Sequence, residues 1–421
     1  MKLLQIHDRD LTPTADGGFD PQSAVCSDRG GGLAVYLADL VGGLRRRNDR
    51  VSVIEFEPDV DGHREAGPGY HRLQSFRFRV RRSTVARFRR IVDQEDPDVV
   101  HLHAVYHELH PLMLRRLAKR RPVIWTPHNV RPVCFRGTKL HPDDRMCGRP
   151  VGLGCLSHGC YRLGSTTGVL SDVARVLSNP VYLAAYRRLD KIVVPSRYLK
   201  DLLVANGFCD GRIDVVPLFS RFAACAGAAS VGAGPDRILF VGRLDQKKGI
   251  ESFLEALAIL RHRPWEAVIV GDGKLFEPLR TLVQRHELAD RVSFVGDVTA
   301  EHLAGHYRAC SFVVFPSLIP EAFGLVGVEA MSFGKAVVAF DSGGVNEWLQ
   351  DGVTGLLADH GQVEHLAKLI DRLITDRGLS SRLGENGRCR ADQCFTLEHH
   401  LDRMQSIYAD QVEAFRMVGT E

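Results

Sequence analysis

Short apolar runs alternate with longer amphipathic segments along this chain, and that alternation restricts the folds it can adopt. The apolar runs of the first half are residues 1–7, 51–54, 99–102, 123–125 and 192–194. Residues 33–44, between the first two runs, have the apolar spacing of a helix. Buried strands that alternate with helices are typical of a parallel, doubly wound sheet.

A second series of the same kind follows a stretch of small residues at 223–235. Its apolar runs are residues 238–241, 267–270, 292–294, 312–315 and 336–339. A chain of 421 residues is also too long for one ordinary core. We therefore predict two doubly wound, Rossmann-like α/β domains at 1–217 and 237–395, a linker at 218–236 and a final helix at 396–421.

Composition is that of an ordinary globular protein, with 44% apolar and 25% charged residues. The net charge of +4 is small, so we expect no nucleic acid partner. No apolar run approaches the roughly 18 to 20 residues that span a membrane. The first residues lack the apolar core of a signal peptide, and we expect a cytoplasmic protein. The sequence does not indicate an oligomeric state.

Two glutamates, Glu321 and Glu329, flank the start of a predicted helix that follows the run 312–315. At about 1.5 Å per helical residue, their carboxylates lie on the order of 10 Å apart. Gly324 between them allows close approach of the backbone, and a helix N-terminus binds phosphate. The pattern suits a sugar nucleotide, with a carboxylate for sugar hydroxyls, another for ribose hydroxyls and the diphosphate between them. The alternative is a surface helix with two solvated glutamates.

The segment 320–331 resembles the E-x7-E motif of retaining GT-B glycosyltransferases of family 4. The resemblance implies two Rossmann-like domains that face each other across a cleft, and a final helix that crosses back to the first domain. It implies sugar transfer from a nucleotide sugar with retention and without a catalytic metal or other cofactor. Glu321 would hold the donor hexose and Glu329 the ribose. The other donor-binding residues implied here are Phe323, Gly324 and Leu325.

A basic loop, 242–249, follows the first predicted strand of the second domain and matches the family pattern G-R-x4-K-G. Cleavage of a nucleotide sugar places negative charge on the departing phosphates, and a positioned cation stabilises it. Arg243 offers a planar fork and Lys248 a point charge. The resemblance gives both residues the diphosphate and makes them catalytic. The alternative is a solvated basic loop.

Four further residues are donor-binding by the same resemblance: Gly31, Gly32, Gly271 and Val295. The glycine run 30–32 precedes the first helix and permits close backbone approach to a ligand. Gly271 lies in a Gly-Asp-Gly turn near the nucleotide base, and Val295 backs the base through main-chain groups. The alternatives are a flexible loop before a helix and a common turn.

Three histidines compete for the place beside the reacting groups. His128 comes just past the end of the predicted strand 123–125, where ligand groups gather in open α/β sheets. His101 and His103 lie on the preceding strand. We assign His128 as catalytic and acceptor-side, in line with the family, and keep His103 as a second acceptor-side candidate, since only geometry can settle such an assignment.

Four cysteines, Cys134, Cys147, Cys155 and Cys160, share a glycine-rich insertion at 134–160. Four thiolates can bind Zn²⁺ tetrahedrally and give such a loop a fixed fold. The spacing contains no C-x2-C pair, so free or paired cysteines are the alternative. Any such zinc would be structural.

Seven arginines cluster before Ile91: Arg77, Arg79, Arg81, Arg82, Arg87, Arg89 and Arg90. A basic patch of this kind can contact a membrane surface that carries a lipid-linked acceptor. A solvated helix face is the interpretation we favour.

The resemblance implies transfer of a hexose to a hydroxyl group of a small polar acceptor, with UDP-N-acetylglucosamine as the donor that the family favours, since no residue here dictates the donor. The overall layout is similar to N-acetylglucosaminyltransferases of aminoglycoside antibiotic biosynthesis, so the acceptor implied is an aminoglycoside intermediate. A polysaccharide or lipid-linked acceptor is the alternative. UDP-sugar epimerases or hydrolases share the fold, as would a noncatalytic sensor, but the intact basic loop and acidic motif argue against both.

Overall fold

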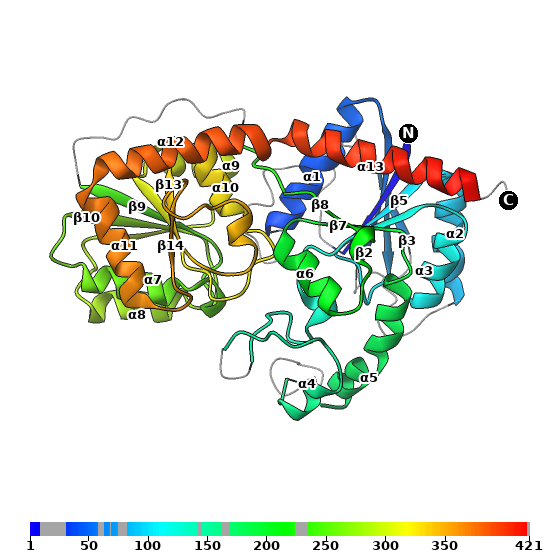
Figure 1. The fold of residues 1–421 in the computed structure, drawn as a ribbon, viewed down its shortest axis with the longest axis horizontal. Coiled ribbons are helices and arrows are strands. Elements are labelled where there is room, and N and C mark those ends of the chain that lie inside the picture. The colour runs from blue at the N-terminus through cyan, green and yellow to red at the C-terminus, as the bar shows by residue number, and fades with distance from the viewer. Residues whose placement is uncertain are drawn as a thin grey trace. The chain divides into compact units, whose positions relative to one another are not determined.

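The structure is a computed structural model that describes residues 1–8, 31–57, 63–67, 69–74, 82–141, 145–160, 169–223 and 235–418. The chain divides into two compact units (Figure 1). The first comprises residues 1–20, 40–216 and 401–421, and the second comprises 21–39 and 217–400. Most of the predicted linker, 224–234, lies outside the described residues.

The first unit is built on an eight-stranded sheet of order β3-β4-β2-β1-β5-β6-β7-β8. Its strands are β1 (Lys2–His7), β2 (Arg50–Glu57), β3 (His63–Gly67), β4 (Tyr70–Gln74), β5 (Val99–His103), β6 (Val123–Thr126), β7 (Lys191–Val194) and β8 (Ile213–Val215). Its helices are α2 (Arg82–Glu95), α3 (Pro111–Ala118), α4 (Gly154–Ser157), α5 (Val169–Tyr186) and α6 (Arg197–Ala205). Neighbouring strands are parallel, except that the edge strand β3 runs antiparallel to β4.

Two helices, α1 (Gly31–Arg46) and α13 (Leu397–Val418), each contain residues of both units. Helix α1 begins in the second unit and continues into the first, and α13 passes to the first unit at residue 401. Within the first unit, α13 is fixed by hydrogen bonds. Arg47 Nη1 donates to Asp402 Oδ1 at 2.6 Å, and Gln405 Nε2 donates to Asp49 Oδ2 at 2.7 Å.

The second unit has a fully parallel sheet of order β11-β10-β9-β12-β13-β14. Its strands are β9 (Asp236–Val241), β10 (Trp265–Val270), β11 (Val292–Gly296), β12 (Phe312–Phe315), β13 (Ala336–Phe340) and β14 (Leu356–Ala358). Its helices are α7 (Ile250–Ile259), α8 (Phe276–Arg285), α9 (Ala300–Ala309), α10 (Leu325–Ser332), α11 (Val363–Thr375) and α12 (Arg377–Cys394). These two sheets confirm the predicted fold class of two Rossmann-like domains.

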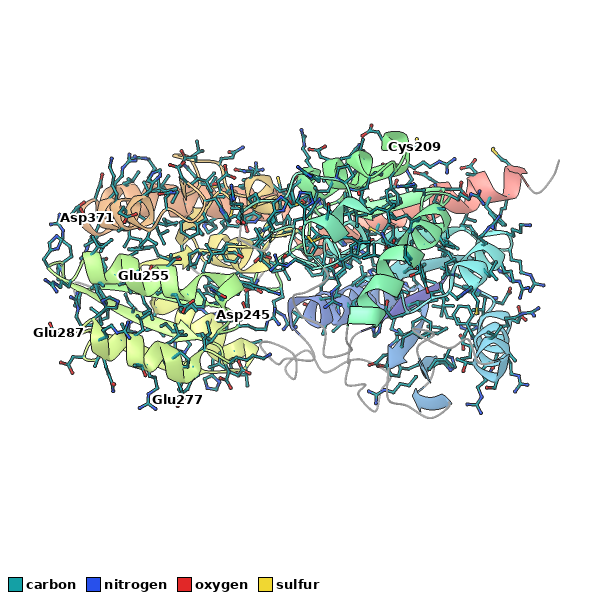
Figure 2. All side chains as sticks on the ribbon, turned by 90° about the horizontal axis from the view of Figure 1, so that it is seen from below. Cys209, Asp245, Glu255, Glu277, Glu287 and Asp371 are labelled. Carbon is teal, nitrogen blue, oxygen red and sulfur yellow. The ribbon has the colours of Figure 1, made fainter. Side chains whose placement is uncertain are left out.

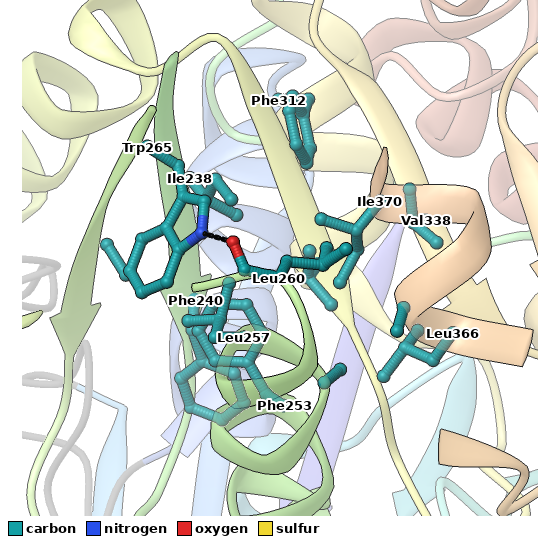
Figure 3. Packing of buried hydrophobic residues seen from close by; sticks show 14 of the residues in the cluster. Ile238, Phe240, Phe253, Leu257, Leu260, Trp265, Phe312, Val338, Leu366 and Ile370 are labelled. Carbon is teal, nitrogen blue, oxygen red and sulfur yellow. Dashed lines mark hydrogen bonds between the residues drawn. The ribbon is translucent and has the colours of Figure 1, made fainter. Parts of the chain in front are cut away.

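The core of the second unit forms because its strands bury both faces. On β9, Ile238 and Phe240 pack with α7 and α11, while the alternate residues are buried on the opposite face. Figure 3 shows this cluster, in which Trp265 donates from Nε1 to the carbonyl oxygen of Leu260 at 2.8 Å. Parallel strands buried on both faces have nearly continuous apolar sequences, as found in the runs above.

Among the described residues, no helix combines the length and the apolar character that crossing a membrane would require.

Helix α12 approaches the turn before β13 so closely that we predict a strong effect of one added methyl group. A Cβ atom at Gly384 would lie 2.1 Å from the carbonyl oxygen of Gly334, a main-chain atom that cannot rotate away. Gly384→Ala should therefore cost about 1–3 kcal/mol and lower the melting temperature by several degrees.

The matched control is Gly305→Ala on α9, where an added Cβ would meet no atom within 4 Å. Alanine there should stabilise the helix by up to about 1 kcal/mol. Equal melting temperatures for the two variants, measured by calorimetry, would contradict the close approach at Gly384.

Candidate functional site

The strand order of the second unit determines where its candidate site lies. The first strand of that unit, β9, pairs with β10 on one side and with β12 on the other, so the direction of winding reverses between β9 and β12. In open α/β sheets, ligands bind outside the carboxyl ends of the strands at this switch point. The two loops that leave β9 and β12 carry the basic residues 243 and 248 and the acidic residue 321.

The loops after β9 and β12 touch through their main chains. Gly249 has a φ of +68°, and a Cβ atom there would lie 1.8 Å from the carbonyl oxygen of Pro316. Only glycine permits this contact. Beside it, the carbonyl oxygen of Lys247 accepts from the Leu318 N–H at 2.9 Å. The two loops are thus held together by main-chain atoms.

This contact brings two predicted site residues, Lys248 and Glu321, into an ion pair. Lys248 Nζ lies 2.7 Å from Glu321 Oε1, and the same oxygen accepts from the Ser317 hydroxyl at 2.7 Å. Both charged side chains are mostly buried, at 22% and 13% exposure. A half-buried pair of this kind leaves the lysine charge balanced until an anion competes for it.

Arg243 lies on the same loop but is more open to solvent. Its Nη2 lies 3.4 Å from Asp245 Oδ2, and 48% of its side chain is exposed. Asp245, labelled in Figure 2, also caps the short 3-10 helix 246–248, since its Oδ1 accepts from the Lys248 N–H at 3.2 Å. Asp245 therefore contacts the Arg243 side chain and fixes the main chain at Lys248.

Helix α10 begins directly after the Glu321 loop, as predicted. Gly324, with a φ of +97°, precedes its first residue, Leu325. Trp348 fixes the main chain just before this helix, because its Nε1 donates to the Phe323 carbonyl oxygen at 2.6 Å. A Cβ atom at Gly327 would lie 2.1 Å from the Trp348 ring. The helix N-terminus is therefore fixed in place beside the ion pair, where first-turn N–H groups favour an anion.

The side chain of Phe323 does not fit the donor-binding role predicted for it. It is 2% exposed and packs against Phe395, with ring centroids 5.9 Å apart. Its apolar ring belongs to the core under the loop, so only main-chain atoms of Phe323 can meet a ligand.

Glu329 lies in the second turn of α10, as predicted, and is half-buried. Its Oε2 accepts from the Tyr307 hydroxyl at 2.9 Å. Loss of solvent around the carboxyl group raises the pKa of Glu329, and the Tyr307 hydrogen bond opposes that rise. A bound hydroxyl donor, such as a ribose, would stabilise the ionised form further.

The predicted turn at Gly271 packs against the basic loop. An added Cβ at Gly271 would lie 2.0 Å from the Gly242 carbonyl oxygen, and the Gly271 N–H donates to Gly296 at 2.9 Å. Val295, the residue before Gly296, is 41% exposed on the edge strand β11. These positions line the loops at the carboxyl ends of β9, β10 and β11.

The glycine run meets the start of α10. Gly30 lies outside the described residues, and Gly31 is the first residue of α1. Gly32 is exposed, and a Cβ atom there would lie 3.0 Å from Leu325 Cδ1. The second unit therefore brings Gly32 and Leu325, two residues predicted to bind the donor, into contact.

The histidines lie in the first unit. His128 follows β6 and is half-buried, and its Nε2 lies 3.0 Å from His103 Nδ1. His103 is fully buried on β5, and His101 is 1% exposed. Burial prevents His103 from meeting an acceptor directly, and of the three only His128 is partly exposed.

The four cysteines of the insertion are not arranged as the predicted zinc site. All four are free thiols, and within the described ranges no three histidine, cysteine or acidic side chains are grouped to hold a metal ion. Burial and the neighbouring thiols raise the pKa of Cys160. Zinc binding by the four thiols stays a prediction.

The arginine cluster is only partly described. Arg77, Arg79 and Arg81 lie outside the described residues, and α2 begins at Arg82. Further along α2, three arginines are exposed: Arg87, Arg89 and Arg90. Arg89 lines a groove between α2 and α3 whose floor includes Phe88 and Leu117. Contact with a membrane stays a prediction.

Three residues around the site were not predicted: Ser317, Tyr307 and Trp348. Ser317 could have been identified from the sequence, because it precedes Glu321 in the same loop and a hydroxyl there can orient a carboxylate. Tyr307 and Trp348 reach the site from α9 and from the loop after β13. No sequence spacing links them to Glu329 and Phe323, so only the fold identifies them.

Two family models match the chain and agree with this geometry. The Glycosyltransferase Family 4 model matches residues 30–219, and the Glycosyl transferases group 1 model matches residues 230–390. The chain therefore belongs to the GT-B glycosyltransferases, with one domain of each type.

The chain resembles individual curated proteins at low sequence identity. The chain is 33% identical over 175 residues to an alpha-D-kanosaminyltransferase of Streptomyces kanamyceticus, a match to 41% of this chain and 45% of that protein. It thus spans about half the length of the first curated relatives it matches, 45% and 54%.

Two solved structures have the same fold over nearly the whole chain. One is sucrose-phosphate synthase from Thermosynechococcus elongatus, with a TM-score of 0.72 and 22% identity over 98% of this chain and 100% of that chain. The other is Anabaena HepE in complex with UDP, with a TM-score of 0.68 and 19% identity over 97% and 100%. At these identities the likeness shows the fold.

The raised pKa of Glu329 predicts a pH-dependent gain in stability on removal of its charge. The folded protein holds the proton of Glu329 to a higher pH than the unfolded chain does, so the wild type loses stability as pH rises from the unfolded pKa through the folded pKa. Glu329→Gln should therefore melt at a higher temperature than the wild type at about pH 7. The difference should vanish near pH 4.

The control is Glu385→Gln on α12, where Arg388 hydrogen-bonds the carboxylate and lowers its pKa. That variant should show no gain at neutral pH. A Glu329→Gln protein that is less stable than the wild type at neutral pH would show that the ionised carboxylate is favoured in the fold.

Proposed function

We propose that this protein is a retaining glycosyltransferase that moves a hexose from a UDP-sugar to a hydroxyl group of a small polar acceptor. The observation that carries the proposal is the Lys248–Glu321 ion pair of 2.7 Å at the switch point of the second sheet. It pairs a cation for phosphate with a carboxylate for sugar hydroxyls, directly before the N-terminus of α10.

The charges of the site residues suggest the part that each would take in binding the donor. A donor diphosphate would compete with Glu321 for Lys248 and take a second contact from Arg243. Release from the lysine would leave the Glu321 carboxylate to accept hydrogen bonds from the hexose. Glu329, in the second turn of α10 and hydrogen-bonded by Tyr307, would accept from the ribose hydroxyls. His128 would orient the acceptor or the hexose.

The reaction proposed is displacement on the face of the leaving group. The bond between the anomeric carbon and the phosphate oxygen breaks, and a bond from that carbon to the acceptor oxygen forms. The acceptor's proton passes to the departing phosphate, which leaves as UDP. Lys248, Arg243 and the first turn of α10 stabilise the charge that develops on that phosphate. No cofactor takes part in these steps.

The donor we propose is UDP-N-acetylglucosamine and the acceptor an aminoglycoside intermediate. The 33% identity over 175 residues to an alpha-D-kanosaminyltransferase supports an amino sugar as the transferred group, and the likeness in fold to a protein crystallised with UDP supports the nucleotide. The aminoglycoside acceptor rests on the resemblance in layout described above. A lipid-linked or polysaccharide acceptor is the alternative.

We place the reaction in the cytoplasm. The cysteines in the described part of the chain are all free thiols, which is the usual state in a reducing compartment.

A donor screen by mass spectrometry tests the proposed function. The purified protein is incubated with UDP, GDP, dTDP and ADP sugars, alone and with aminoglycoside cores, simple sugars and lipid-linked sugars. A conjugate formed from UDP-N-acetylglucosamine and an aminoglycoside core is the expected product. Release of an epimerised free sugar without any acceptor would instead establish an epimerase.

Replacement of Lys248 tests the role of the ion pair in the transition state. Lys248→Ala should lower kcat by about 10²- to 10³-fold, because the charge on the leaving phosphate loses its partner. UDP affinity should fall much less, by about tenfold or less, since other contacts hold the nucleotide in the ground state. Steady-state kinetics and calorimetric UDP titration measure the two effects.

Lys247→Ala is the matched control, because it removes the same charge from the adjacent, exposed position of the same loop. It should leave kcat within about threefold of the wild-type value. Equal losses of kcat and of UDP affinity in Lys248→Ala would show that the lysine only binds the ground state.

A further inference from the structure

A chain of buried hydrogen bonds leads away from His128 through the first unit. His128 Nε2 lies 3.0 Å from His103 Nδ1, and His103 Nε2 lies 2.6 Å from Gln5 Oε1. Both inner side chains are fully buried. The chain of hydrogen bonds therefore connects His128, in the loop after β6, to the middle of β1.

The same chain continues to the C-terminal helix. Gln5 Nε2 donates to the Tyr408 hydroxyl at 3.4 Å, and that hydroxyl lies 2.8 Å from His101 Nδ1. His101 Nε2 lies 2.8 Å from Thr126 Oγ1. Tyr408 is fully buried on α13, and desolvation raises its pKa, so the hydroxyl keeps its proton and must donate it.

The Gln5 side-chain amide determines which atom donates and which accepts at each link of this series of hydrogen bonds. An imidazole ring and a hydroxyl group can each donate or accept, but an amide oxygen only accepts and an amide nitrogen only donates. Because Gln5 Oε1 faces His103, the proton of a neutral His103 ring lies on Nε2 and its Nδ1 is an acceptor. The nitrogen that faces this acceptor, Nε2 of His128, must therefore carry a proton.

The hydrogen bonds from Gln5 through Tyr408 and His101 to Thr126 follow the same order of donors and acceptors. The Gln5 amide nitrogen donates to Tyr408, and Tyr408 donates to His101 Nδ1. His101 then carries its proton on Nε2 and donates to Thr126. Every link from His128 to Thr126 thus has one donor and one acceptor, in a single sense. Reversal of the Gln5 amide would reverse every proton in the chain.

We propose that Gln5 and Tyr408 are positioning residues that hold His128 in the tautomer with its proton on Nε2. Nδ1 is then the acceptor nitrogen of the ring and cannot donate. It is buried in this structure, so a sugar or acceptor hydroxyl would reach it only after a local rearrangement of the loop after β6. The tautomer follows from the contacts alone, whereas its use in transfer rests on the function proposed above.

Nitrogen NMR of the imidazole rings tests the proposal directly. Protein labelled with ¹⁵N-histidine is compared with a His128→Gln sample, which identifies the His128 signals. In the wild type, the proton of His128 should be found on Nε2, and so should that of His103. A proton on Nδ1 of His128 in the wild-type protein would overturn the proposal without any further variant.

Two variants then test the positioning residues. Gln5→Met keeps the length of the side chain but removes both amide contacts, so the His128 signals should shift to a mixture of tautomers. Tyr408→Phe removes the hydroxyl that the amide nitrogen faces, so the amide can reverse and a smaller shift in the same direction is expected. Unchanged His128 signals in both variants would show that His128 is held by other contacts.

Tyr186→Phe is the control, because it removes another buried tyrosine hydroxyl from the same unit. That hydroxyl donates to the Val105 carbonyl oxygen at 3.0 Å and has no link to His128. The His128 spectrum should be unchanged, whatever the loss in melting temperature. A shift as large as that of Tyr408→Phe would mean that any loss of packing perturbs the ring.

Kinetics separate this proposal from the proposed function. If the wild type transfers a sugar, Gln5→Met should lower kcat by about tenfold or more with little change in the KM for the donor. Equal kcat in Gln5→Met and the wild type, with altered tautomers, would exclude a role in transfer. Absence of turnover in the wild type, with the expected spectrum, would contradict the function and leave the hydrogen-bond chain standing.

Discussion

The main-chain contact between Gly249 and Pro316 is the constraint on which the candidate site depends. A side chain at position 249 would overlap the Pro316 carbonyl oxygen, so the loops after β9 and β12 can meet only with glycine in a left-handed conformation. Their contact brings the Lys248 amine within 2.7 Å of the Glu321 carboxylate. Gly343 supports the other side of the Glu321 loop, where Gly344 donates to the Glu321 carbonyl oxygen at 2.7 Å. Rigid backbone, more than side-chain packing, therefore sets the distance between the two charges.

Most of the fold could be predicted from the sequence, because parallel strands covered on both faces need nearly continuous apolar runs. The run 312–315 became β12 and the run 336–339 became β13, both fully buried. The strands that escaped prediction are short or polar. β4 has the sequence Tyr-His-Arg-Leu-Gln near one edge of its sheet, and β14 has three residues. A short edge strand lacks the apolar run that marks a central one, so only its partner in the sheet identifies it.

The candidate site was predictable where its residues are close in sequence. The order Gly-Arg-x4-Lys-Gly and the pair Glu321 and Glu329 each follow one strand, so the motif itself indicated the loop. Tyr307 and Trp348 escaped because the fold brings them from other elements. The cysteines could not be assigned from the sequence for a different reason: four thiols within one short insertion allow a metal site or free thiols, and the choice depends on directions in space that a count does not contain.

The place of Tyr408 in the chain affects how the first unit matures during synthesis. The strands of its sheet end at Val215, yet Tyr408 comes from α13, which follows the entire second unit. Every other residue of the hydrogen-bonded series, from Gln5 to His128, is therefore synthesised long before Tyr408 and its hydroxyl group. A nascent first unit can form its sheet, since domains fold as they emerge, but the Gln5 amide nitrogen and His101 Nδ1 do not meet the Tyr408 hydroxyl until the last helix arrives. His128 thus acquires its final environment only in a nearly complete chain, because the hydrogen bonds that connect it to Tyr408 are completed last.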